Sequence, residues 1–64
     1  MNALMEENFR LQLIKEINAV RVRFTGNPIS PKEFAQKLKM PLEKLEQERI
    51  NAVMIYNMYP LGFN

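Results

Sequence analysis

The chain has 64 residues and a formal net charge of +2, and it contains neither cysteine nor histidine. A chain of this length forms at most one domain and buries only about 60% of its unfolded surface, so its core is marginal unless something reinforces it. Without cysteine a disulfide is excluded, and without histidine a metal site is unexpected. We therefore expect one domain over residues 1–64 that has no cofactor and is stabilised by helix packing or self-association.

The composition also argues against catalysis. The chain has no His, Cys, Asp or Trp, and it holds one Ser and one Thr. A general acid–base pair would have to come from Glu, Lys or Tyr, and no such pair stands in a recognisable arrangement. Glu43, Glu46 and Glu48 have no His beside them, so a solvated helix face is their expected role. We expect no enzymatic activity and no small-molecule substrate.

Hydropathy gives no sign of a membrane protein. The longest uncharged run, residues 50–64, is too short to span a bilayer and is interrupted by Asn51, Asn57, Pro60 and Gly62. The N-terminal residues lack the basic region of a signal peptide. We expect a cytoplasmic protein without membrane contact.

The first predicted element is a helix from about Asn2 to Phe24. Gly26, a favourable C-terminal residue, is expected to stop it. At 100° per residue this helix carries two apolar stripes on almost opposite sides. The first stripe consists of Phe9, Leu13, Ile17, Val20 and Phe24, and the second consists of Leu4, Leu11 and Val22. Two short neighbouring helices cannot cover both stripes, so we expect the second to form an interface. The alternative is that all of these side chains fill the core.

The end of this helix also admits a second interpretation. Residues 20–24 alternate with period two, as a short strand does, and a turn would follow at residues 25–28. The alternative fold is therefore α+β, with short strands near 20–25 and 52–58. We favour the helix because its apolar stripe is longer and the preceding residues are strong helix formers.

A second helix is predicted from Pro31 to Leu38 by signals at its start. Ser30 and Glu33 form an S-x-x-E capping box, and Pro31 occupies the first helical position. We expect this helix to bury its apolar side chains against its neighbours, namely Phe34, Ala35 and Leu38.

A third helix is predicted to begin near Pro41 and to end at Met58 or Tyr59, before Pro60. Its expected core face consists of Leu42, Leu45, Ala52, Val53 and Tyr56. The opposite side is polar at first and then becomes apolar, and a contiguous exposed apolar patch indicates a contact surface. Methionine and tyrosine suit such surfaces. The expected interface residues here are Met54, Ile55, Met58 and Tyr59.

Residues 31–50 carry a pattern with Phe34, the small Ala35 and Leu38 in one helix, followed by apolar Met40 and Leu45. This pattern resembles the helix-turn-helix of phage-repressor-type DNA-binding proteins. Residues 29–35 are also loosely similar to the N-terminal helical module of bacterial translation initiation factor 2. Lys39 stands where the repressor family has glycine, and a left-handed conformation costs such a residue about 1 kcal/mol. We therefore expect a turn of different geometry.

The resemblance implies a dimeric DNA-binding regulator from a phage or mobile element, with the start of the third helix in the major groove. The DNA contacts that it implies are Lys32, Lys37, Lys39, Glu43, Lys44 and Gln47, and Arg21 and Arg23 would extend the basic patch. The carboxylates of the third helix would lie unfavourably close to phosphates.

Together these patterns predict an all-α three-helix domain with a helix-turn-helix-like second half. The expected function is that of a small non-catalytic regulatory or interaction protein, which forms a homodimer and binds a protein partner. DNA-binding transcription regulation is the alternative.

Overall fold

The computed structural model describes residues 2–58, which form three helices and no strand. The helices are α1 (Ala3–Thr25), α2 (Pro31–Leu38) and α3 (Leu42–Met58). The predicted all-α three-helix domain is confirmed. The α+β alternative is wrong, because residues 20–25 form the last turns of α1 and residues 52–58 continue α3. Tyr59, an expected interface residue, lies outside the described residues.

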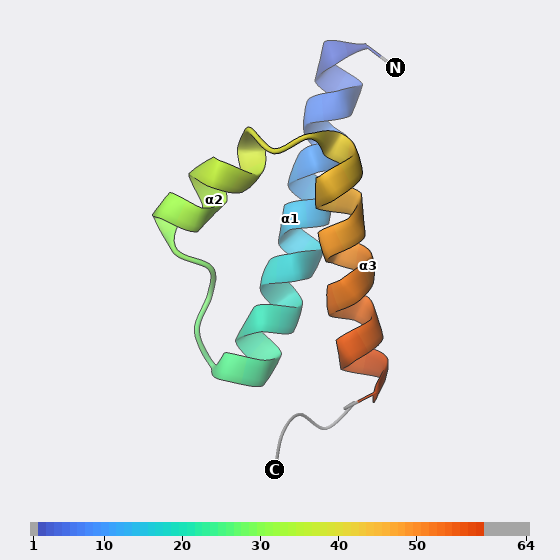
Figure 1. The fold of residues 1–64 in the computed structure, drawn as a ribbon. Coiled ribbons are helices and arrows are strands. Elements are labelled where there is room, and N and C mark those ends of the chain that lie inside the picture. The colour runs from blue at the N-terminus through green and yellow to red at the C-terminus, as the bar shows by residue number, and fades with distance from the viewer. Residues whose placement is uncertain (1, 59–64) are drawn as a thin grey trace.

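Figure 1 shows that α1 and α3 lie side by side and run in the same direction. α2 stands beside α1 and leads the chain back to the start of α3, and the first turns of α1 project beyond that start. The main packing contact joins α1 to α3, and a smaller one joins α1 to α2. The short α2 therefore covers only part of one side of a longer helix pair.

The helix ends lie where local chemistry predicts them. The Asn2 side chain accepts a hydrogen bond from the Met5 N–H at 2.8 Å, and the Ser30 hydroxyl accepts one from the Glu33 N–H at 3.1 Å. Gly26 closes α1 in the left-handed conformation, with φ of 77°. Lys39 ends α2 at φ of −100°, in the right-handed region, so the expected departure from a left-handed turn is confirmed.

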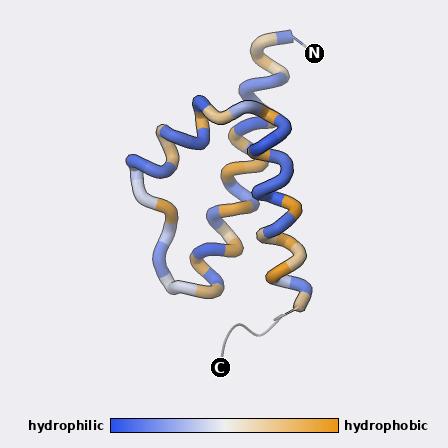
Figure 2. The backbone as a smooth tube through the Cα atoms, viewed as in Figure 1, coloured by the Kyte–Doolittle hydropathy of each residue, from blue (hydrophilic) through white to orange (hydrophobic). Residues whose placement is uncertain are grey.

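The fully buried apolar core is small and lies where α1 meets the first turns of α3. It consists of Leu13, Ile14, Ile17 and Leu45. Of the predicted core face of α3, only Leu45 is fully buried, and Tyr56 is 38% exposed. Figure 2 shows further hydrophobic segments in the C-terminal half of α3, beyond the part of the pair that α2 accompanies.

The predicted burial of apolar side chains on α2 is wrong. Phe34 is 38% exposed, Leu38 is 36% exposed, and Ala35 is exposed as well. The buried residue of α2 is Lys37, which is only 6% exposed. The physical reason is that α2 turns Lys37 toward carboxylates on its own first turn and on α3, so its apolar side chains lie at the margin of the core.

Candidate interaction surfaces

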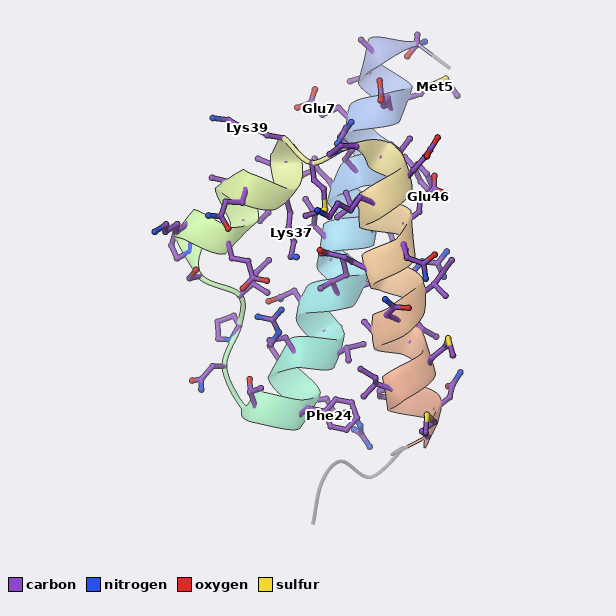
Figure 3. All side chains as sticks on the ribbon, in the orientation of Figure 1. Met5, Glu7, Phe24, Lys37, Lys39 and Glu46 are labelled. Carbon is purple, nitrogen blue, oxygen red and sulfur yellow. The ribbon has the colours of Figure 1, made fainter. Side chains whose placement is uncertain are left out.

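Four charged residues, which we call the charge cluster, connect the three helices: Arg21, Glu33, Lys37 and Glu48. The Arg21 guanidinium donates two hydrogen bonds to the Glu33 carboxylate, from Nη1 to Oε1 and from Nη2 to Oε2, each 2.8 Å long. The Lys37 ammonium lies 3.3 Å from Glu33 Oε2 and donates a hydrogen bond to Glu48 Oε1. In Figure 3 the Lys37 side chain points from α2 toward α1 and α3.

The cluster is electrostatically satisfied. The hydrogen bonds from Arg21, and secondarily the one from Lys37, lower the pKa of Glu33 from 4.5 to about 2, although burial acts in the opposite direction. The same pairing raises the pKa of Arg21. At neutral pH the two cations and two carboxylates cancel, so the cluster has no excess charge with which to attract an ionic ligand. It is a link between helices.

A groove of about 500 Å³ lies beside the charge cluster. The charged residues and Asn51 form its polar wall, and its apolar wall consists of Ile17, Val20, Phe24, Ala52 and Ile55. The charged side chains that line this groove are paired with one another, and its apolar wall can receive an apolar group. Ile55 lies on this side of α3, about 100° around the helix from Met54.

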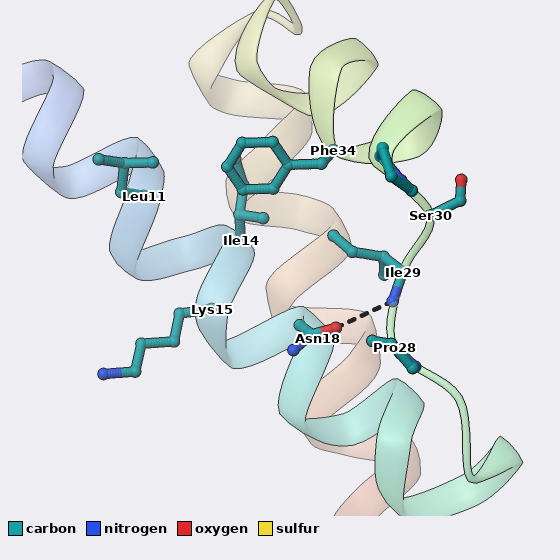
Figure 4. Close-up of a pocket in the computed structure, with 9 residues that line it drawn as sticks. Leu11, Ile14, Lys15, Asn18, Pro28, Ile29, Ser30 and Phe34 are labelled. Atoms are coloured by element: carbon teal, nitrogen blue, oxygen red, sulfur yellow. Dashed lines mark hydrogen bonds between the residues drawn. The ribbon is translucent and has the colours of Figure 1, made fainter.

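A second groove, of about 390 Å³, separates α1 from the linker and the start of α2. Leu11 and Ile14 contribute to its wall on α1, and Ile29 and Phe34 contribute to the opposite wall (Figure 4). Asn18 Oδ1 accepts a hydrogen bond from the Ile29 N–H at 2.9 Å and so holds the linker against α1.

The predicted second stripe of α1 is exposed in the single chain, and its middle residue, Leu11, lines this groove. Leu4 is 66% exposed, Leu11 is 40% exposed and Val22 is 41% exposed. Leu11 precedes the buried Leu13 by two residues and the buried Ile14 by three, which places it about 200° around α1 from Leu13 and about 60° from Ile14. We call these three residues, together with the adjacent Phe34, the α1 flank.

A second exposed apolar row follows α3 at intervals of four residues. Ile50 is 41% exposed, Met54 is 55% exposed and Met58 is 68% exposed. We call this row the α3 flank. Ile50 was not among the predicted interface residues, although its position one turn before Met54 was a sufficient signal.

The two flanks face away from each other. Leu13 and Leu45 both belong to the core between α1 and α3. Leu11 lies about 200° from Leu13, and Met54, nine residues after Leu45, lies about 180° from it. The predicted interface residues are therefore not one surface: the structure divides them between opposite sides of the α1–α3 pair, with Ile55 in the groove beside the charge cluster.

The residues expected to contact DNA are also divided. Lys32, Lys39 and Lys44 are exposed, as are the predicted base-reading residues Glu43 and Gln47, and Figure 3 shows Lys39 pointing away from the core at the end of α2. Within residues 2–58 none of the three lysines forms an ion pair. Lys37 is different, because it is buried and its ammonium is held by two carboxylates.

Other kinds of site are absent from the described part of the chain. Residues 2–58 contain no group of three His, Cys, Asp or Glu side chains placed to hold a metal ion. None of the helices formed by these residues has both the length and the hydropathy needed to cross a bilayer. Comparisons with protein-family models, with curated proteins and with solved structures yield no match to this chain.

Proposed function

We propose that this chain is a small non-catalytic interaction protein that self-associates and acts by binding a macromolecular partner. The observation that carries the proposal is the distribution of apolar side chains. Within the described residues, the fully buried core holds four of them, whereas the α1 and α3 flanks leave Leu4, Leu11, Val22, Ile50, Met54 and Met58 in water.

Burial of these flanks in a contact would favour association. Moving a fully exposed Ile, Leu or Met side chain out of water is worth about 1.5–3 kcal/mol, and the partly exposed flank side chains would each gain roughly half of that, while association costs lost freedom of motion. Several such side chains on one helix flank suffice for reversible association, but not for a very tight complex. The charge cluster is paired internally, so among the described residues it does not compete with the apolar flanks as a contact surface.

Sedimentation velocity tests the proposal, with protein at roughly ten micromolar to about one millimolar, the range in which weak complexes form. We expect the weight-average mass to rise with concentration above the 7.6 kDa of one chain. A helical protein that keeps the mass of a single chain throughout this range would overturn self-association.

DNA binding is a second candidate, supported by the exposed and unpaired Lys32, Lys39 and Lys44 around the α2–α3 turn. An electrophoretic shift with duplex DNA at low salt tests it. Binding that weakens steeply as salt rises is expected from phosphate contacts. If no shift occurs at tens of micromolar protein, the DNA candidate is eliminated and the interaction protein stands.

A further inference from the structure

We propose that copies of this chain join head to tail, with the α3 flank of one copy docked on the α1 flank of the next. This inference rests on the proposed self-association and specifies how it occurs. It commits to a second copy of the chain as the occupant of both flanks.

The placement of the flanks favours a contact between two different patches. The flanks lie on opposite sides of the α1–α3 pair, as the angular positions of Leu11 and Met54 require. A two-fold symmetric dimer buries the same patch on both copies, so it can cover one flank and leaves the other in water. A contact between two different patches covers both kinds of flank in every interior copy.

The shapes of the two flanks are also complementary. Ile50, Met54 and Met58 stand four residues apart and form one ridge along α3, the kind of row that packs into a groove on another helix. The α1 flank borders such a groove, the one between Leu11 and Phe34 in Figure 4. Flexible methionine side chains adapt to a groove of this kind, and their sulfur atoms make favourable contacts with aromatic rings.

The two flanks also carry complementary charges. Glu46 continues the α3 ridge one turn before Ile50, and Figure 3 shows it on the outer side of α3. Lys15 lies one turn after Leu11 at the edge of the groove. Within residues 2–58 neither Glu46 nor Lys15 forms an ion pair. Each flank therefore presents an unpaired charge, and the two charges are opposite.

The spacing of these groups selects an orientation. Glu46 lies about 6 Å from Ile50 along α3 and about 18 Å from Met58, at 1.5 Å per residue. On α1, Lys15 lies about 6 Å from Leu11 and about 16 Å from Leu4, in the opposite direction along the chain. Antiparallel docking therefore aligns Glu46 with Lys15, Ile50 with Leu11 and Met58 with Leu4, whereas Met54 falls opposite Glu7 and Val22 lies beyond the start of α3.

Antiparallel docking also determines the relative direction of successive copies and whether the assembly can grow. Because α1 and α3 run in the same direction within one copy (Figure 1), successive copies must alternate in direction. Each added copy presents a new free flank, so growth continues unless the rotation between copies closes a ring.

Two single variants and their mixture test the inference by sedimentation velocity. Leu11→Lys damages the α1 flank and keeps the α3 flank, and Met54→Lys does the reverse. We expect each variant alone to lose association by at least tenfold in affinity, and we expect their equimolar mixture to form a dimer that does not grow further. The wild type is expected to pass beyond the dimer as concentration rises.

Gln12→Lys is the matched control, since it adds the same charge to an exposed position of α1, about 100° from Leu11. It should associate as the wild type does, and all variants should keep their far-ultraviolet circular dichroism. If only one of the two flank variants loses association, or if the mixture stays monomeric while the wild type associates, head-to-tail joining is wrong and self-association survives. If the wild type is a monomer, both head-to-tail joining and self-association are wrong.

A charge reversal tests the orientation without placing a charge among the apolar residues. Lys15→Glu alone and Glu46→Lys alone each bring like charges together in the antiparallel contact and should weaken association about three- to tenfold at low salt. The double variant should recover the wild-type affinity. If the double variant is as weak as the singles, the antiparallel alignment is wrong.

Discussion

The two halves of α3 differ in a way that their composition does not suggest. The first half, from Leu42 to Arg49, is rich in charged residues, yet it contains the deeply buried Leu45 and the carboxylate of Glu48 that holds Lys37. The second half, from Ile50 to Met58, is mostly apolar, yet none of its residues is fully buried.

This difference shows that the burial of a segment of α3 depends on how many helices pack against it and not on its hydropathy. The first half of α3 lies where α1 and α2 both approach it, whereas the second half has α1 on one side and water on the other. A single copy of the chain therefore stabilises the first half and leaves the second half available for contact with another molecule.

The largest expected effect comes from the buried half. Leu45→Ala removes a side chain with 0% exposure and should cost about 2–5 kcal/mol, which is comparable to the whole stability of a domain of this size. We expect most of the helical circular dichroism to be lost at 25 °C. Met54→Ala is the control from the exposed half, and at concentrations where the chain is a monomer it should change stability by less than about 0.5 kcal/mol. Equal effects of the two variants would abolish the contrast between the halves.

The next effect concerns the link between the first half of α3 and α2. Lys37→Met keeps the length of the side chain but removes the cation shared by Glu33 and Glu48, and it should lower the free energy of unfolding by about 1–2 kcal/mol because both carboxylates are only partly exposed. Urea denaturation measures this change. The control is Lys32→Met, an exposed lysine on the same helix. If the two variants have the same midpoint, the cluster does not stabilise the fold.

Acid should weaken the same link. The pKa of Glu33 in the folded chain is about 2, below its ordinary value of 4.5, so its contribution to stability is fully present above about pH 5 and is lost as the pH falls toward 2. Because the carboxylate is partly exposed, we expect a contribution of about 1 kcal/mol. Urea midpoints should show Glu33→Gln less stable than the wild type at pH 7 and equally stable near pH 2. A constant difference across this range would contradict the assignment.

The smallest expected effect lies in the second half of α3, where Arg23 stands over the Tyr56 ring with its guanidinium carbon 5.0 Å from the ring centre. A cation–π contact at such an exposed position is worth about 0.5 kcal/mol. A double-mutant cycle with Arg23→Met and Tyr56→Leu should give a coupling energy of that size. A coupling energy above about 2 kcal/mol would mean that the second half is held as firmly as the first.

The candidate surfaces were only partly predictable from the sequence. The exposed stripe of Leu4, Leu11 and Val22 was predictable because helical periodicity alone places these residues away from Leu13. The burial of Lys37 was not, because its partner Glu48 lies on another helix, eleven residues away. The division of the interface into two opposite flanks also required the position of α3 beside α1.

The sequence by itself determined the three helices, both ends of α1 and the start of α2, because the caps at Asn2, Ser30 and Gly26 act within a few residues of the chain. Only the tertiary structure decided that Lys37 is buried while Phe34 is exposed. The physical reason is that the side of a short helix that faces inward depends on the sum of its contacts with other helices. Here the ion pairs of Lys37 with two carboxylates and the two short linkers set the inward face of α2, in place of its apolar side chains. The local sequence pattern of α2 does not predict this orientation.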